Sequence, residues 1–302
     1  MSITIGVTTY NRPGYVKKMR QSLYASRGLD RCHIRVYDDC SNEFTIEDLR
    51  ILFPDAKEIV RRERNLGSDQ NIRQMFVDFL QTGDDLLVAA DSDLLFRPDW
   101  IDFVLENFKY TDGMLGLYNS LLHLSSGKEV VINANEFIEK KHTGSAGVVM
   151  SKEIVREIVE NIPPMAGYDW AWSKYLRKSG KRLLVSKRSY VQHIGLRGYN
   201  CDGFKTTEFG LYFYPGNQIN EQFLIEFFQE FIVGVGTLIR QETLDIKISK
   251  FTVSPIKIIK RSRKTLKRLM KRKIKKPIKR LIKRLVKKPV KRLRLKKRKI
   301  RR

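Results

Sequence analysis

Short apolar segments alternate with amphipathic ones along the first 110 residues of the chain. Runs rich in β-branched residues predict strands, whereas apolar positions spaced three and four apart predict helices. The predicted strands cover residues 3–8, 34–39 and 85–90, and the predicted helices cover 13–26, 68–80 and 98–108. This order predicts a nucleotide-binding type of α/β unit, in which ligands bind at the carboxyl ends of parallel strands.

The pattern is more mixed after residue 114. We predict further strands at 115–118, 129–132 and 182–185, and further helices at 152–161, 169–178 and 219–240. A small-residue loop is expected at 141–147 and a linker at 243–254. The predicted fold class is therefore α/β, with a mixed, mostly parallel sheet flanked by helices.

Charge separates the end of the chain from the rest. The 302 residues carry 59 Lys and Arg against 33 Asp and Glu, a formal net charge of +26. Residues 255–302 hold 27 basic and no acidic side chains, which leaves 32 basic and 33 acidic residues before them. We therefore expect three regions: a globular domain at 1–205, a helical extension at 206–254 and a basic tail at 255–302.

The basic tail also has apolar positions spaced three and four residues apart, and it lacks Phe, Tyr and Trp. An amphipathic cationic helix suits an anionic membrane, where each basic residue contributes about 1 kcal/mol. Nucleic acid is a less favoured partner because base stacking needs aromatic residues. A solubilising tail without a dedicated partner is the remaining alternative.

Three features bear on the compartment. Three cysteines are too few to stabilise the chain by disulfide bonds, which indicates a reducing compartment. The first residues lack the pattern of a secretory signal. Glu226, Gln229 and Glu230 interrupt the most apolar later window, so it is too polar to span a bilayer. We expect a cytoplasmic protein bound peripherally to the inner face of the membrane through residues 255–302.

Two aspartates follow the predicted strand at 85–90 directly. Side chains alternate along a strand, so Asp91 and Asp93 are expected to project to the same side. Two such carboxylates repel each other unless a cation lies between them, and a hard divalent ion such as Mn²⁺ or Mg²⁺ would relieve that repulsion. The alternative is a solvated turn before Pro98.

Four motifs occur together in a fixed order: Thr8-Thr9-Tyr10-Asn11-Arg12-Pro13, Asp38-Asp39, Arg64-Asn65-Leu66-Gly67 with Asn71, and Asp91-Ser92-Asp93. Singly, each is explained by a helix cap or an ordinary turn. Jointly, they resemble the family 2 glycosyltransferases, inverting enzymes of GT-A fold that use nucleotide-diphosphate sugars. The resemblance covers about residues 1–200.

The resemblance implies roles for these residues. Thr8, Tyr10 and Arg12 would line the nucleotide pocket, Asp39 with its neighbour Asp38 would accept from a uracil-like base, and Asn65 and Asn71 would flank the same pocket. Asp91 would face the ribose or the metal, and Asp93 would ligate the metal. A UDP-sugar is the favoured donor.

Two later residues complete the predicted site. Asp169 stands where family members carry their catalytic carboxylate, and it is predicted to be the general base, with a helix cap as the alternative. His193 is a candidate metal ligand, although a histidine at a strand end is often structural. Trp170 and Trp172 offer a platform for an acceptor sugar, but at i, i+2 they face different ways and at least one is expected in the core.

The sequence therefore predicts a metal-dependent hexosyltransferase that transfers a sugar to a hydroxyl of a glycan, lipid-linked or protein acceptor, in polysaccharide biosynthesis. One alternative is a non-catalytic polyanion-binding protein built on a degenerate nucleotide-binding fold. A nucleotidyltransferase of similar topology is disfavoured, because the first strand is not followed by a Gly-rich basic loop.

Overall fold

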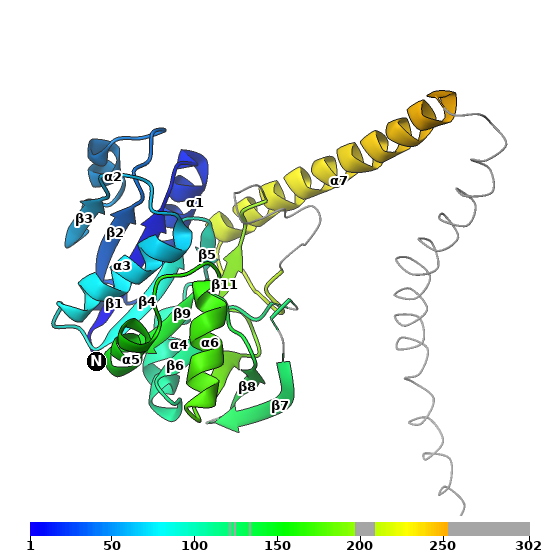
Figure 1. Cartoon of the computed structure of the whole chain (residues 1–302). Helices are drawn as coiled ribbons and strands as arrows, with labels where there is room; N and C mark the ends of the chain where they lie inside the picture. The colour runs from blue at the N-terminus through cyan, green and yellow to red at the C-terminus, as the bar shows by residue number, and fades with distance from the viewer. Residues whose placement is uncertain (121, 124, 133, 197–208, 253–302) are drawn as a thin grey trace, which may run out of the picture. The chain divides into compact units, whose positions relative to one another are not determined.

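The computed structural model describes residues 1–120, 122–123, 125–132, 134–196 and 209–252. The described residues form a nine-stranded sheet with the order β3-β2-β1-β4-β9-β6-β10-β8-β7 and a two-stranded sheet of β5 and β11 (Figure 1). The strands of the large sheet are β1 (Ile3–Thr9), β2 (Cys32–Asp38), β3 (Glu58–Arg61), β4 (Leu86–Asp91), β6 (Met114–Gly116), β7 (Ser125–Ile132), β8 (Asn135–Lys140), β9 (Val148–Ser151) and β10 (Leu183–Ser186). The small sheet pairs β5 (Leu94–Phe96) with β11 (Val191–His193).

The first half of the sheet is parallel, and its register fixes where the polar motifs meet. Thr8 of β1 lies opposite Asp91 of β4, and Thr9 lies opposite Asp38 of β2. The carboxyl ends of these three strands therefore share one edge. β9 runs antiparallel to β4 and β6, so the sheet is mixed, and the predicted fold class is confirmed.

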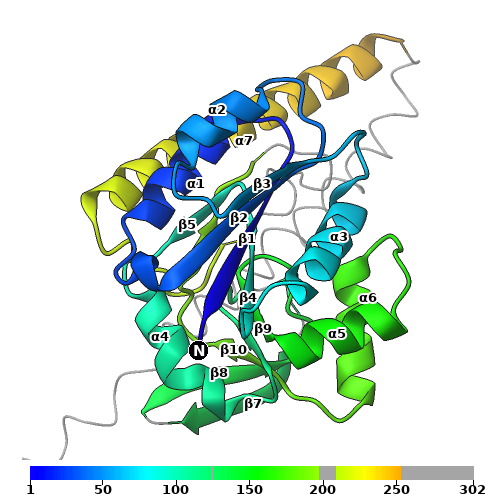
Figure 2. The same ribbon diagram turned by 90° about the vertical axis from the view of Figure 1, so that its left-hand side faces the viewer.

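Helices cover both faces of this sheet, as Figure 2 shows. The helices are α1 (Pro13–Tyr24), α2 (Ile46–Leu52), α3 (Ser68–Leu80), α4 (Trp100–Asn107), α5 (Lys152–Asn161) and α6 (Tyr168–Lys178), with short 3-10 turns at Leu29–Arg31 and Phe108–Tyr110. α1, α2 and α4 pack on one face, and α3, α5 and α6 pack on the other.

Strand alternation divides the core between those two faces. In β4, Val88 and Ala90 pack with α1 and α4, whereas Leu87 and Ala89 pack with α3, α5 and α6. The contact between β1 and α3 is so close that a Cβ at Gly6 would overlap the Met75 side chain. Burial of both faces explains why β4 reads as a nearly continuous apolar run.

The strands β5, β8, β9 and β11 were not predicted from the sequence, and two further parts of the chain differ from the prediction. α2 and β3 lie between residues 40 and 67, where no element was predicted. The predicted linker at 243–254 is wrong as far as residue 252, because α7 (Gln218–Thr252) continues through it. No Gly or Pro stands between 237 and 252 to end that helix, and Pro255 follows soon after.

By its contacts the chain divides into two units, Met1–Gly234 and Val235–Arg302. The boundaries expected at 205 and 254 stay predictions, and the amphipathic pattern of the tail lies outside the described residues. No helix among the described residues combines the length and the apolarity that crossing a bilayer requires.

Candidate active site

The edge where β1 and β4 end brings together the first predicted site residues. The Thr8 hydroxyl donates to Oδ1 of Asp91 across 3.2 Å. Arg12 follows in the turn that leads from β1 into α1, where Asn11 and Arg12 both have positive φ angles of 52° and 58°. This unusual turn directs the Arg12 side chain toward the end of β4, where its guanidinium meets Asp93.

Asp93 is the centre of an ion-pair group. Its Oδ2 lies 2.9 Å from the Arg12 guanidinium, and its Oδ1 lies 3.3 Å from Nε2 of His193. The pairing of β11 with β5 sets His193 opposite Leu94, beside the aspartate. The structure therefore joins Arg12, Asp93 and His193, which lie far apart in the sequence.

The surroundings of Asp91 and Asp93 shift the pKa values of the two side chains in opposite directions. Burial, together with the negative charge of Asp93, raises the pKa of Asp91 to about 6. Burial also opposes ionisation of Asp93, but His193 and Arg12 outweigh it and hold the pKa of Asp93 well below its usual range. Asp93 is therefore a firmly ionised carboxylate that lies beside a more protonatable one.

The same group of side chains bears on metal binding. Among the residues that the structure describes, no group of three or more His, Cys, Asp or Glu side chains is arranged to hold a metal ion. Asp91, Asp93 and His193 nevertheless supply the oxygen and nitrogen donors that Mn²⁺ and Mg²⁺ accept. The donor chemistry fits a divalent cation, while the observed arrangement is an ion-pair network with Arg12.

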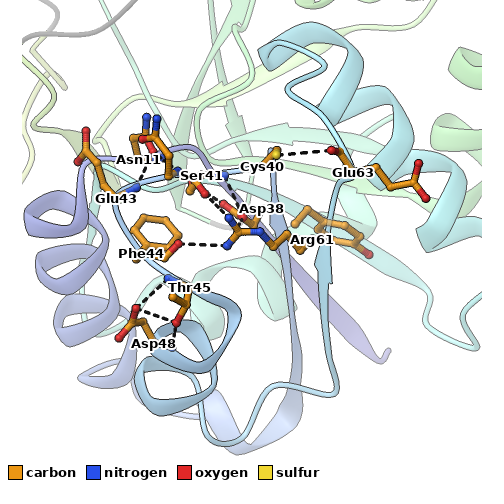
Figure 3. A network of polar contacts seen from close by, with 12 residues as sticks. Asn11, Asp38, Cys40, Ser41, Glu43, Phe44, Thr45, Asp48, Arg61 and Glu63 are labelled. Carbon is orange, nitrogen blue, oxygen red and sulfur yellow. Dashed lines mark hydrogen bonds and ion pairs between the residues drawn. The ribbon is translucent and has the colours of Figure 1, made fainter.

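The other predicted nucleotide residues are held mainly by the protein itself. Asp38 is fully buried and accepts from the backbone N–H and the hydroxyl of Ser41, beside the Arg61 guanidinium (Figure 3). Burial raises the pKa of Asp38. Asn11 joins the same network, because its N–H donates to the Ser41 hydroxyl and its side-chain oxygen accepts from the N–H groups of residues 42 and 43.

Asp39 anchors the loop that precedes α3. Its two oxygens accept from the backbone N–H groups of Leu66 and Gly67 at 2.7 and 2.9 Å. Asn65 closes a local turn onto the N–H of Gly67 at 3.0 Å. The carboxylate of Asp39, 3% exposed, accepts two of the about four hydrogen bonds that such a group can accept.

Asn71 and Tyr10 differ in exposure. Asn71 is buried, donates to the Tyr37 carbonyl and accepts from Arg62, so it joins β2 and the residue that follows β3 to α3. Tyr10 is exposed after β1, at the same edge as Thr8. Tyr10 is thus accessible to a ligand, whereas Asn71 is a buried support between β2 and α3.

Asp169 belongs to a second group of side chains. It lies in the first turn of α6, with Oδ2 3.4 Å from Nε2 of the buried His142. Within the described residues, the hydrogen bonds and ion pairs of Asp169 are with His142 and Trp170, not with Asp91 or Asp93. Trp172 is fully buried and Trp170 is exposed. Of the two tryptophans, Trp172 is therefore the one that lies in the core.

Two residues of the site escaped the sequence prediction. Asp69, near the start of α3, accepts from the N–H groups of Gly167 and Tyr168 at 3.1 Å each, and it thereby fixes the beginning of α6. Gly195 packs against Asp93 so tightly that a Cβ would overlap Oδ2. No local pattern in the sequence signals these distant contacts. Asp69 is simply the second residue of a helix, and Gly195 simply follows His193 by two positions.

Comparison with known proteins gives a family match over the first part of the chain. Residues 4–116 match the family model described as glycosyl transferase family 2. The predicted family resemblance is confirmed. No curated protein sequence is significantly similar to the chain.

Solved structures extend the likeness beyond the matched residues. S. aureus TarS 1-349 in complex with UDP-GlcNAc is 16% identical, with a TM-score of 0.50 over 63% of this chain and 58% of that chain. GalNAc-T7 with UDP, GalNAc and Mn²⁺ is 12% identical, with a TM-score of 0.53 over 64% of this chain and 44% of that chain. The chain spans less than two thirds of these structures, and the shared fold is the GT-A glycosyltransferase fold.

Proposed function

We propose that this protein is a hexosyltransferase that transfers a sugar from a nucleotide-diphosphate donor to an acceptor hydroxyl with inversion. The observation that carries the proposal is the group of Thr8, Arg12, Asp91, Asp93 and His193 at the carboxyl ends of β1 and β4. This edge is where α/β sheets bind their ligands.

The proposed reaction needs a base that takes the acceptor proton and a positive charge that stabilises the departing diphosphate. The acceptor oxygen attacks the anomeric carbon, its proton passes to Asp169, and the bond to the diphosphate breaks with its electron pair on the leaving oxygen. Arg12 provides a fixed positive charge at the edge that would receive the diphosphate. Asp169 is only partly buried, so an acceptor has access to it.

A divalent cation, Mn²⁺ or Mg²⁺, is part of the proposal. Asp93 and His193, with Asp91, would hold it, and it would supply charge neutralisation for the departing diphosphate. Burial and, after it, the negative charge of Asp93 raise the pKa of Asp91, and a cation near these carboxylates would favour its ionised form. A bound cation would compete with Arg12 for Asp93.

The donor is proposed to be a UDP-sugar. The support is that TarS 1-349 and GalNAc-T7 were both solved with UDP or a UDP-sugar and share the fold. Asp39 retains acceptor capacity beside Asn65, and Tyr10 is exposed at the same edge. The acceptor is proposed to be a glycan or a lipid-linked saccharide.

The test measures donor binding and donor cleavage with the full chain. A thermal-shift series compares UDP, GDP, ADP and CDP with and without Mn²⁺, and donor hydrolysis is followed as release of the nucleoside diphosphate. We expect one diphosphate to stabilise the protein, Mn²⁺ to increase the shift, and Asp93→Ala to abolish hydrolysis. Asp102→Asn on α4 is the control that should leave both readouts unchanged.

Each outcome discriminates between functions. Binding and hydrolysis without any effect of Mn²⁺ would support the transferase and remove the metal from it. No response to any diphosphate would favour the non-catalytic polyanion binder. In both cases the melting temperature of Asp93→Ala reports whether the variant folds.

We also propose that residues 255–302 attach the enzyme peripherally to an anionic membrane on its cytoplasmic face. The 27 basic residues support this proposal, because a fraction of them at about 1 kcal/mol each suffices for binding. Nucleic acid is the competing polyanion, and it would bind with a steep dependence on salt.

A further inference from the structure

Trp170 is an exposed aromatic ring that rests on a buried imidazole. The Trp170 side chain is 52% exposed, and its ring stacks on His142 with centroids 3.6 Å apart and planes 13° from parallel. His142 itself is 2% exposed. One face of the indole is thus covered by His142, and the exposure of the side chain leaves the ring accessible from solvent.

His142, which lies beneath the Trp170 ring, packs in turn against other aromatic rings. His142 meets the ring of His123 edge-on at 5.1 Å, and His123 meets Tyr118 edge-on at 6.0 Å. Gly144 has a positive φ of 71°, and a Cβ there would lie 2.7 Å from the His123 ring. Burial, with His142 and Lys140 nearby, lowers the pKa of His123 to about 4, so its ring stays neutral.

The same imidazole also faces the proposed base. Nε2 of His142 lies 3.4 Å from Oδ2 of Asp169, the residue that precedes Trp170 on α6. Neither ring nitrogen of His142 has a hydrogen-bond partner of good geometry within the described part of the chain. His142 therefore contacts both Trp170 and Asp169 while remaining inside the protein.

We infer that the exposed face of Trp170 and the Asp169 carboxylate form the subsite for a pyranose acceptor, with His142 as the positioning residue. The C–H face of a sugar ring packs on an aromatic ring, and a sugar hydroxyl donates to a carboxylate. This inference rests on the proposed function, because it assigns the second substrate of that enzyme.

The three tryptophans make this subsite directly measurable. Trp100 and Trp172 are fully buried, so acrylamide quenches Trp170 selectively. The ligands are the methyl pyranosides of glucose, galactose, mannose and N-acetylglucosamine, and glycerol is the control because it has hydroxyls but no ring face. We expect at least one pyranoside, but not glycerol, to protect Trp170 from quenching.

Variants test the assignment by saturation-transfer NMR of the same pyranoside. Trp170→Phe should retain the signal, whereas Trp170→Leu should weaken binding roughly 3- to 10-fold, as expected for one lost aromatic contact. Tyr214→Leu removes another side chain, 63% exposed, and should change nothing. An equal loss in Tyr214→Leu would overturn the assignment.

The positioning role of His142 has its own readout. His142→Phe keeps a flat ring beneath Trp170 and should keep pyranoside binding, but it should lower kcat for transfer because Asp169 loses its neighbour. His142→Ala should weaken pyranoside binding as well. Unchanged kcat in His142→Phe would restrict His142 to a packing role and overturn this part of the inference.

The outcome is separable from that of the proposed function. If a nucleoside diphosphate binds and no pyranoside protects Trp170, the subsite is wrong and the transferase stands. If a pyranoside protects Trp170 and no donor is hydrolysed, Trp170 belongs to a sugar-binding site, but the transferase fails and the assignment as an acceptor subsite fails with it.

Discussion

Gly195 lies directly against the carboxylate of Asp93, where a Cβ would overlap Oδ2 and would also lie 3.1 Å from the His193 ring. The backbone after β11 thus closes over the ion-pair group that holds Arg12. Because the aspartate is almost fully buried, it has little room to retreat from an added methyl group.

Gly195→Ala is therefore expected to displace Asp93. The protein should lose about 1–3 kcal/mol of stability through the overlap, and donor hydrolysis should fall strongly. Gly83→Ala is the matched control, because a Cβ at Gly83 meets nothing within 4 Å. Chemical denaturation and the hydrolysis assay check both effects, and normal hydrolysis in Gly195→Ala would contradict the proposed role of Asp93.

Asp91→Asn should stabilise the protein in a pH-dependent way. The folded state raises the pKa of Asp91 from its ordinary 3.8 to about 6, so charging this group as the pH rises through that range costs stability. The variant should match the wild type at pH 4 and exceed it by about 1–3 kcal/mol at pH 7.5. Thermal melts at the two pH values measure the difference, and equal gains at both would contradict this cause.

Asp69→Ala should loosen the start of α6. The variant leaves the N–H groups of Gly167 and Tyr168 without their acceptor, which is expected to cost about 1–2 kcal/mol. Transfer should fall more than nucleotide binding, because Asp169 lies in that turn. Glu58→Gln, at an exposed ion pair, is the control and should change stability by no more than about 0.5 kcal/mol.

A chain that ends at residue 254 should lose membrane binding. Without the 27 basic residues of the tail its net charge is −1, so it should not sediment with vesicles containing phosphatidylserine. The full chain should sediment with them and not with phosphatidylcholine vesicles. Equal sedimentation of the two chains would contradict the proposed role of the tail, and nucleoside-diphosphate binding checks that the shorter chain folds.

The elements with a clear local pattern were predictable from the sequence. The helices at Ser68–Leu80 and Lys152–Asn161 were predicted with the bounds that the structure has, because their apolar spacing and their ends are local signals. α2 and β3 were missed because short elements depend on their neighbours more than on their own pattern. α7 extends beyond its predicted end at residue 240 because nothing in the sequence after that residue ends the helix before Pro255.

The sequence by itself determined the parallel unit, the order of its motifs and the pair of carboxylates at the end of β4, because alternation and motif spacing act within a few residues. Only the tertiary structure decided that His193 and Gly195 meet Asp93, that Asp69 holds the start of α6, and that Trp170 rather than Trp172 faces solvent. Those contacts join segments about 100 residues apart or depend on which side of α6 the sheet covers. Strand pairing and packing create such contacts, and no local pattern encodes them.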